Sequence, residues 1–498
     1  MNKKYKIFIL IISLLYVVYH LVTLSYSPLP WFDEVSFASI TNSYIKAHTF
    51  YPEAINITVH RQNSMYGPLF FMLQAFIVKM WGLSMFNFRI SNLLFGFADL
   101  YLVYRICLHF RFKAIAIFAT VIILAFDRSY NQFLHSGRMD FMTVFFFLAS
   151  FLAFVSIDTI QKSKAIPLAV LTGALLAASF LTTPRIIFAF SFYCCYFFYD
   201  VYEHRQNVRD TLVKYGMIAI TFSALFYMWV YTEFGNLHNY IDANYTSNEV
   251  IKAHVGTTEF QLNTGLLYFG YALICFIALL TTRQAGRNMK LILFTVPVIV
   301  SFLFLVGGAL SGRYYAMVAP FTTILFVGVT MHLYNNRLLK GLNYGLIGIL
   351  LCIFLFKGFY VFATYKERDP ITNEQRIMQY IPAYSTIGAD FEFYYFARRK
   401  QCYFQSLGEN GIPNTVFNYF RNRDYDYLIF NKHNREIDNY KTWVFRDRYK
   451  LIATIDDDHK TGWLWNMINR MGYMVTENYS CYIYKNISRD TVQTTKRL

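Results

Sequence analysis

The feature of this sequence that most constrains its fold is a series of long apolar runs, separated by short polar loops, over about the first 365 residues. A helix needs about 20 apolar residues to cross the hydrocarbon core of a bilayer. Eleven runs approach or exceed that length, so we expect a polytopic α-helical membrane protein. The expected spans are residues 5–26, 88–109, 113–128, 141–157, 165–182, 185–200, 214–233, 263–281, 290–309, 313–333 and 341–364.

The composition agrees with this fold class. The chain is 56% hydrophobic and only 15% charged, whereas soluble proteins are about 25% charged. These values exclude a soluble globular enzyme and a disordered chain. The formal net charge of +16 would suggest a nucleic-acid partner for a soluble protein. In a membrane protein it is better explained by cytoplasmic loops rich in Lys and Arg, so we expect no nucleic-acid partner.

One further apolar run, residues 66–82, could span the membrane or lie along its surface as an amphipathic helix. With eleven spans and a cytoplasmic N-terminus, most clusters of Lys and Arg fall on the cytoplasmic side, as the positive-inside rule requires. A twelfth span would move these clusters outside. We therefore predict that residues 66–82 lie in the outer interface, within an outer loop of residues 27–87, in a multi-pass protein of the cell (inner or plasma) membrane.

The last part of the chain, residues 366–498, has no run long enough to span and is richer in charged residues. We therefore divide the protein into a transmembrane domain of residues 1–365 and a soluble extracytoplasmic domain of residues 366–498. Short apolar runs between polar, helix-compatible stretches predict a small α/β fold for this C-terminal domain. Its two cysteines, Cys402 and Cys481, could form a disulfide in an oxidising compartment.

Acidic residues are scarce in the transmembrane domain, and two sites of them open onto the same predicted outer face. Asp33 and Glu34 follow the first span, and Asp140 begins the fourth. Asp33 could be the N-cap of a helix ending near Ala47, and Asp140 could complement a helix dipole or pair with Arg138. The functional alternative is a carboxylate held at the membrane surface as a general base.

Arginines also gather on this outer face, which the positive-inside rule should leave poor in positive charge. Such residues could snorkel to lipid headgroups. The alternative is a positive pocket that binds a phosphate through charge-assisted hydrogen bonds. The arginines concerned are Arg61, Arg89, Arg128, Arg138, Arg185 and Arg313.

Taken in order, several short motifs of residues 1–365 resemble those of the polytopic C-type (GT-C) glycosyltransferases that use polyprenyl-phosphate sugars. This group includes protein O-mannosyltransferases and the aminoarabinose transferases that modify lipid A. The motifs are Asp33-Glu34, Gly67-Pro68-Leu69, Phe88-Arg89-Ile90, Gly137-Arg138-Met139-Asp140, and Arg313-Tyr314 with Pro320. The resemblance implies an inverting sugar transfer from a polyprenyl-phosphate-linked donor to an envelope acceptor, which could be a glycan, a lipid or a protein.

The resemblance also implies roles for the acidic residues. Asp33 would be the base that takes the proton of the acceptor hydroxyl, and Glu34 and Asp140 would orient the acceptor or the sugar. The resemblance makes all three candidate catalytic residues.

For the basic and aromatic residues, the resemblance implies donor binding. Arg313, helped by Arg138 or Arg61, would neutralise the departing lipid phosphate. The remaining candidate substrate-binding residues are Tyr66, Arg89 and Tyr314. Tyr66 stands where relatives often carry a histidine, so we assign no metal ligand, and a divalent metal stays an alternative.

Two other classes of function are also compatible with a polytopic chain. A transporter or flippase of lipid-linked glycans would need charges inside the bundle, for which Asp99 and Lys357 are the candidates. A glycan polymerase or ligase with a diphosphate-linked donor would lack the early Asp33-Glu34 loop.

Overall fold

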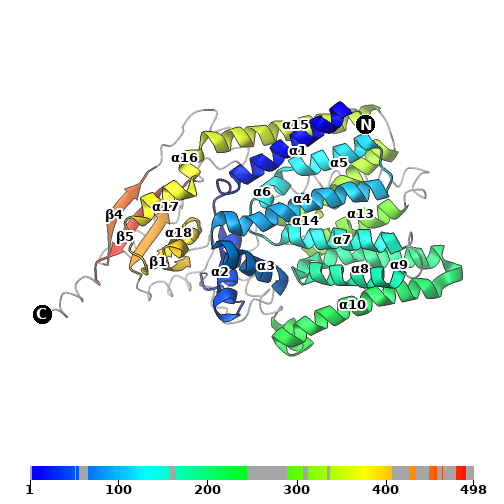
Figure 1. Ribbon diagram of the computed structural model, residues 1–498, viewed down its shortest axis with the longest axis horizontal. Coiled ribbons are helices and arrows are strands. Elements are labelled where there is room, and N and C mark those ends of the chain that lie inside the picture. The colour runs from blue at the N-terminus through cyan, green and yellow to red at the C-terminus, as the bar shows by residue number, and fades with distance from the viewer. Residues whose placement is uncertain are drawn as a thin grey trace.

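The computed structural model describes residues 3–50, 52–54, 66–157, 164–243, 289–306, 312–333, 337–406, 425–432, 448–456, 463 and 478–488. Two parts are visible in Figure 1: a bundle of long helices and a smaller domain with a sheet. No disulfide joins Cys402 to Cys481.

The bundle contains the long apolar helices, which run side by side (Figure 1). Ten of the eleven predicted spans are helical, and the remaining one, residues 263–281, lies outside the described residues. The helices are α1 (Lys3–Thr23), α4 (Met85–His109), α5 (Ala114–Phe126), α6 (Arg128–Leu134), α7 (Asp140–Ile157), α8 (Ala165–Phe180), η2 (Pro184–Phe190), α9 (Ser191–Glu203), η3 (Arg205–Asn207), α10 (Val208–Phe234), α13 (Met289–Val306), α14 (Gly312–Val327), η6 (Gly328–Leu333) and α15 (Arg337–Ala363).

Five helical segments of the described chain are both long and apolar enough to cross a membrane. They are Met85–His109, Asp140–Ile157, Arg205–Phe234, Tyr314–Met331 and Lys340–Ala363. Shorter apolar helices stand beside them, so the structure is that of a polytopic α-helical membrane protein.

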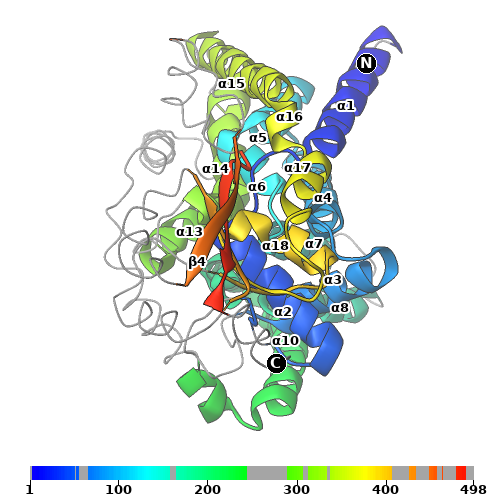
Figure 2. The ribbon, with the colours of Figure 1, turned by 90° about the vertical axis from the view of Figure 1, so that its left-hand side faces the viewer.

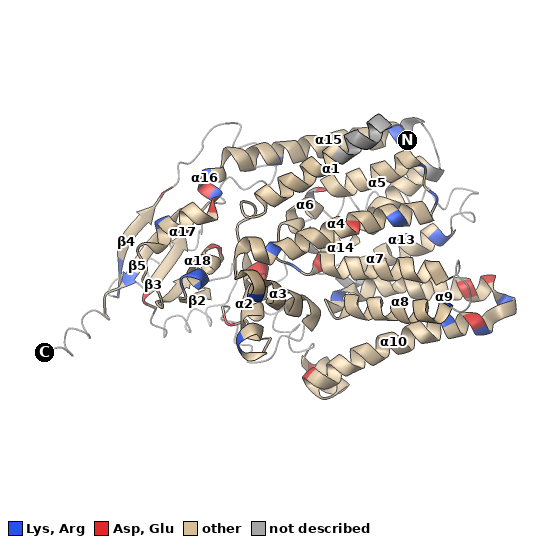
Figure 3. Ribbon diagram, in the orientation of Figure 1, with Lys and Arg blue, Asp and Glu red and all other residues tan. Residues whose placement is uncertain are grey.

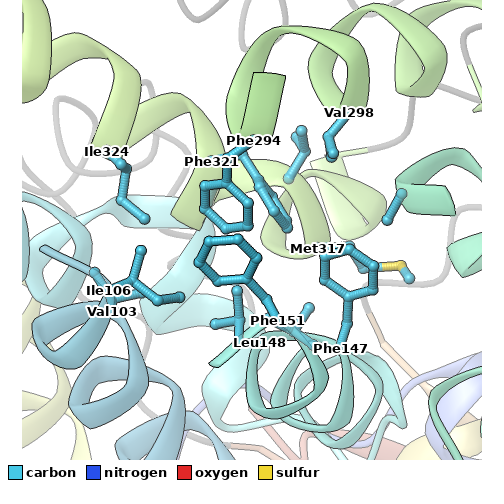
Figure 4. Packing of buried hydrophobic residues seen from close by; sticks show 14 of the residues in the cluster. Val103, Ile106, Phe147, Leu148, Phe151, Phe294, Val298, Met317, Phe321 and Ile324 are labelled. Atoms are coloured by element: carbon cyan, nitrogen blue, oxygen red, sulfur yellow. The ribbon is translucent and has the colours of Figure 1, made fainter. Parts of the chain in front are cut away.

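Large aromatic side chains hold the centre of the bundle together (Figure 4). Phe151 of α7 stacks on Phe294 of α13, with ring centroids 3.9 Å apart, and Phe294 in turn contacts Phe321 of α14 at 5.2 Å. All three rings are fully buried. Lipid tails are as apolar as these side chains, so close packing rather than exclusion of water favours their association.

Two shorter helices, α2 (Phe32–Ala47) and α3 (Pro68–Trp81), occupy the end of the bundle nearest the sheet domain (Figure 1). The Gln74 amide of α3 donates to the Phe88 carbonyl at 2.9 Å, which ties α3 to α4. Gly67 precedes α3 because a Cβ there would lie 1.8 Å from the Leu181 carbonyl oxygen. With 14 residues, α3 is shorter than a membrane-spanning helix, which agrees with the interfacial helix predicted for residues 66–82.

The C-terminal part forms a five-stranded mixed sheet with helices, as the α/β prediction requires. The strand order is β2-β1-β3-β5-β4, with β1 parallel to β2 and β3 and with β5 antiparallel to β3 and β4. Figure 2 looks onto this domain from its own side of the molecule. Its elements are α16 (Tyr365–Arg368), α17 (Pro370–Met378), β1 (Thr386–Ala389), η7 (Phe391–Phe393), α18 (Tyr394–Arg399), β2 (Tyr403–Ser406), β3 (Tyr427–Asn431), β4 (Tyr449–Ile455) and β5 (Cys481–Asn486).

The sheet domain and the end of the bundle share one hydrophobic cluster. Phe37 of α2 and Phe88 of α4 belong to the same buried cluster as Tyr395 of α18 and Ile429 of β3. The rings of Phe88 and Tyr395 lie 6.4 Å apart. The C-terminal domain is therefore packed directly onto the helices that carry the acidic motif.

Charged residues lie mainly at the two ends of the bundle (Figure 3). Acidic and basic residues occur together around α2 at one end and beside α9 and α10 at the other. The start of α1 lies at the end of the bundle remote from the sheet domain (Figure 1).

Candidate functional site

The first acidic pair lies in the first turn of α2, at the end of the bundle. Asp33 and Glu34 are both buried, with 6% and 0% of their surface exposed. The helix ends at Ala47 as predicted, but its N-cap is Trp31 rather than Asp33, and Trp31 makes no side-chain cap bond. Asp33 is the second residue of the helix, so its carboxylate does not cap the helix and binds another partner.

That partner is Arg138, which bridges the two acidic sites predicted from the sequence. Its Nη1 pairs with Asp33, and its Nε donates to Asp140 Oδ2 at 2.5 Å. Asp140 is the first residue of α7. Although Asp33 and Asp140 are 107 positions apart in the sequence, they meet on one guanidinium that is 1% exposed.

Burial opposes the charge of Arg138, but Asp140 and Asp33 outweigh this effect and hold its pKa above the ordinary value for arginine. The guanidinium also lies over the rings of Trp31, Phe37 and Tyr314, at 5.6, 5.8 and 5.7 Å. Cation, carboxylates and aromatic rings therefore form one compact cluster.

Glu34 belongs to a second buried ion pair beside the first. Arg89 Nε and Nη2 donate to its two carboxylate oxygens at 2.9 and 2.8 Å, and neither side chain is exposed. Arg89 Nη1 donates to the Leu24 carbonyl at 2.9 Å. The Tyr395 hydroxyl of α18 donates to Glu34 Oε1 at 3.0 Å. Glu34 thus links α2 to α4 and to the C-terminal domain, and Arg89 adds a bond to the residue that follows α1.

A close approach of two chain segments places these ion pairs side by side. A Cβ on Gly137 would lie 2.2 Å from the Phe88 ring and 3.1 Å from Glu34 Cγ. Only glycine fits here without movement of Phe88, which is fully buried. The glycine of the Gly137-Arg138-Met139-Asp140 motif therefore has a packing role.

A second cation continues the cluster away from the carboxylates. Arg185, in η2, lies over the ring of Tyr314 at 4.5 Å and over that of Tyr66 at 5.1 Å. Tyr314 stands between the two arginines, because it also contacts Arg138. Burial raises the pKa of Tyr66 to about 12, so its hydroxyl stays protonated and can donate a hydrogen bond at neutral pH.

Arg185 differs from the other two arginines in its partners. Arg89 and Arg138 are bound to carboxylates, whereas within the described residues Arg185 makes no ion pair. Of these three described arginines, Arg185 is therefore the one whose positive charge is best suited to an incoming anion. The sequence places Arg185 on the predicted outer face but indicates no role for it, because Arg185 is not part of a recognised motif.

Two predicted phosphate-binding residues cannot be compared with this geometry. Arg61 lies outside the described residues, and so does the side chain of Arg313. Arg313 does follow Gly312 at the start of α14 and immediately precedes Tyr314. The described candidates Asp33, Glu34, Asp140, Arg138, Arg89, Tyr66 and Tyr314 all belong to the cluster.

The carboxylates of this cluster are paired with arginines. Among the described residues, no group of three or more His, Cys, Asp or Glu side chains is arranged to hold a metal ion. Asp33 and Asp140 share Arg138, and Glu34 binds Arg89 through both oxygens.

The residues proposed for a transporter are not part of this cluster. Asp99 is buried in α4, and neither carboxylate oxygen has a hydrogen-bond partner in the part of the chain that the structure describes. Lys357 lies in α15. The predicted intramembrane charges are thus separate from the row of ion pairs at the bundle end.

Comparison with known proteins shows likeness in structure and none in sequence. No family model matches the sequence, and no curated protein sequence matches it. The chain is similar to the crystal structure of ArnT from Cupriavidus metallidurans bound to undecaprenyl phosphate, with a TM-score of 0.61 and 11% identity. The alignment covers 96% of this chain and 97% of that one. The apo structure of the same ArnT aligns with a TM-score of 0.49, also at 11% identity, over 98% of this chain and 99% of that one.

The likeness to the undecaprenyl-phosphate-bound structure extends over both parts of the molecule. The structure therefore has the fold that the sequence motifs predict, a GT-C-type membrane bundle with a small C-terminal sheet domain. One solved protein that shares this fold is ArnT. At 11% identity the comparison shows the fold alone, so the activity has to be argued from the cluster.

Proposed function

We propose that this protein is an integral-membrane glycosyltransferase that moves a sugar from a polyprenyl-phosphate carrier to a hydroxyl of an envelope acceptor. The observation that carries the proposal is the row of groups at the end of the bundle. It runs from the carboxylates of Asp33 and Asp140 through Arg138 and Tyr314 to Arg185. A base and a cation for a leaving phosphate are the two groups that such a transfer needs.

The donor end of the site is Arg185, with Tyr66 and Tyr314 on either side. A guanidinium binds phosphate through paired, charge-assisted hydrogen bonds, and the Tyr66 hydroxyl can add another. ArnT, which shares the fold, is bound to undecaprenyl phosphate in its crystal structure. This supports a polyprenyl phosphate as the carrier. Arg313 and Arg61 are further donors of positive charge in the proposal.

The acceptor end of the site is Asp33. Its carboxylate takes the proton of the acceptor hydroxyl while the hydroxyl oxygen attacks the anomeric carbon of the sugar. The bond from that carbon to the phosphate oxygen breaks, and its electron pair leaves on the polyprenyl phosphate. Attack from the side opposite the phosphate inverts the anomeric configuration.

Arg138 and Glu34 act on the position of the base. Arg138 holds Asp33 against Asp140, and the paired Arg89 and Glu34 fix the first turn of α2. Such fixed groups need little reorganisation during the reaction, which is how enzymes use electrostatics most effectively. Asp140 orients the sugar or the acceptor in this arrangement.

The proposed location is the cell membrane, with the N-terminus in the cytoplasm and the C-terminal domain outside. The acidic cluster and the C-terminal domain lie at one end of the bundle, and the start of α1 lies at the other (Figure 1). A lipid-linked donor suits the outer face, because nucleotide-activated sugars are not available there.

The test is the rate of sugar transfer by the Asp33→Asn variant in reconstituted membranes. Asparagine keeps the shape but cannot accept the proton, so we expect transfer to fall by about 10²–10⁴-fold while the protein remains folded. The matched control is Asp200→Asn, which changes a buried carboxylate paired with Lys214 at 3.1 Å, remote from the cluster. Full transfer by Asp33→Asn would exclude Asp33 as the base.

A further inference from the structure

A cavity of about 360 Å³ lies on the seam between the helical bundle and the C-terminal domain. Its bundle side is formed by the end of α1 and the start of α4, including Val22 and Phe86. Its other side is formed by α17, η7 and α18, including Ile371 and Tyr395. Among the described lining residues are none of Asp33, Arg138 and Arg185, so the proposed reaction does not use this cavity.

The apolar lining of the cavity continues onto surface that faces lipid. Val22 and Phe86 are 49% and 40% exposed although they belong to apolar helices of the bundle, and Ile371 of α17 is 60% exposed. Apolar side chains exposed at the end of membrane-spanning helices are in contact with acyl chains. A chain from a neighbouring lipid can therefore enter the cavity without leaving an apolar environment.

The charged lining of the cavity is mainly acidic. Among the described lining residues, Asp369 and Glu392 supply two carboxylates, and the single cation, Arg399, pairs with Glu374. Asp369 also caps α17: its Oδ2 accepts from the Thr372 amide at 3.0 Å and from the Thr372 hydroxyl, and its Oδ1 accepts from the Ile371 amide at 3.4 Å. Each carboxylate oxygen can accept two hydrogen bonds, so Oδ1 keeps a further acceptor site. The lining is thus net acidic in a protein whose net charge is +16.

We propose that this cavity binds a phospholipid with a primary ammonium headgroup, such as phosphatidylethanolamine. A primary ammonium donates hydrogen bonds to carboxylates, whereas the trimethylammonium of phosphatidylcholine has no N–H to donate. An anionic headgroup without an amine would be repelled by Asp369 and Glu392. The lipid phosphate then lies on the side of Arg399, and one acyl chain lies between α1 and α4.

The bound lipid acts on the acidic cluster through Tyr395. The ring of Tyr395 lines the cavity, while its hydroxyl donates to Glu34 Oε1 at 3.0 Å. Tyr479 also lines the cavity, but within the described residues its hydroxyl has no hydrogen-bond partner. A lipid that fills the cavity holds Tyr395 in place, and Tyr395 in turn positions Glu34 beside Asp33. This second step rests on the proposed function, and the binding step does not.

The binding step is tested with photoreactive lipids in bilayer nanodiscs of phosphatidylcholine that contain the full chain. We expect a photoreactive phosphatidylethanolamine to label the cavity segments about tenfold more than the matching phosphatidylcholine or phosphatidylglycerol. The double variant Asp369→Asn with Glu392→Gln should lose this preference. Asparagine is as good an N-cap as aspartate, so α17 keeps its cap. Equal labelling by the three lipids, or a preference that survives in the double variant, would overturn the proposal.

The coupling step is tested by the transfer rate in nanodiscs with and without phosphatidylethanolamine. The lipid should raise kcat of the wild type several-fold with little change in the KM for donor, and Tyr395→Phe should remove that increase while still being labelled. Tyr479→Phe, the matched control, should keep it. An increase that persists in Tyr395→Phe would refute the coupling. Absence of transfer under every condition would count against the proposed function, while the labelling result would still decide the lipid site.

Discussion

The buried ion pair between Glu34 and Arg89 gives the sharpest prediction about stability. Both side chains are completely buried, and two hydrogen bonds of 2.9 and 2.8 Å join them. In Arg89→Met, Glu34 keeps only the Tyr395 hydroxyl as a partner among those described above. Removing one member of a buried pair costs about 3–5 kcal/mol, because the remaining charge is uncompensated. We expect the free energy of unfolding to fall by that amount.

The double variant Glu34→Leu with Arg89→Met separates this reasoning from a simple loss of contacts. This double variant leaves no buried charge. Two polar groups lose their partners, the Leu24 carbonyl and the Tyr395 hydroxyl, and each loss costs at most about 1–3 kcal/mol of unfolding free energy. The double variant should therefore be more stable than Arg89→Met alone. The assay is reversible unfolding in one detergent, followed by intrinsic fluorescence, for all variants.

An exposed pair provides the control for the same assay. Lys46 and Glu53 lie 3.6 Å apart with half and about a third of their side chains exposed, so Lys46→Met should cost less than about 1 kcal/mol. The double variant of Glu34 and Arg89 could instead lose as much unfolding free energy as the two single variants together. That result would show that burial of an unpaired charge is not the cause, and it would refute the reasoning.

Three further predictions follow from the cluster. Arg138→Lys keeps one positive charge but loses the fork that reaches two carboxylates, so transfer should fall at least tenfold in the reconstituted assay; unchanged transfer would argue against the bridge. Gly137→Ala should lower the unfolding free energy by about 1–3 kcal/mol, because its Cβ would lie 2.2 Å from the Phe88 ring. An unchanged stability in thermal unfolding would mean that Phe88 moves freely. Arg185→Ala should weaken the binding of undecaprenyl phosphate about tenfold or more in a titration. Arg205→Ala is the control: it removes another arginine that stacks on a tyrosine ring, at 4.1 Å, and should leave binding unchanged.

Much of the fold could be predicted because apolar runs in a membrane protein translate directly into helices. The positions of the predicted spans agree with the described helices. The short apolar runs of the C-terminal domain, residues 385–388, 427–430, 449–455 and 481–484, coincide closely with strands β1, β3, β4 and β5. The sheet order could not be predicted, since it depends on pairing between strands far apart in sequence. Strand β2 could not be recognised, because two of its four residues, Gln405 and Ser406, are polar and leave no apolar run.

For the site, the sequence identified the charged residues but not their partners. Asp33, Arg138 and Asp140 stand out because charges are scarce in an apolar chain, and they do meet in one cluster. The role of Glu34 as a fully paired carboxylate was not foreseen, because its partners come from α4 and from α18, 361 positions later. Arg185 was overlooked as a separate site residue for the same reason, since only its packing between Tyr66 and Tyr314 distinguishes it.

The most direct test of the central claim is an experimental structure of this protein with undecaprenyl phosphate bound. The account predicts that the phosphate lies within hydrogen-bond distance of Arg185, beside Tyr66 and Tyr314, at the same end of the bundle as Asp33. A phosphate bound at the opposite end, or one that contacts neither Arg185 nor its two tyrosines, would contradict it.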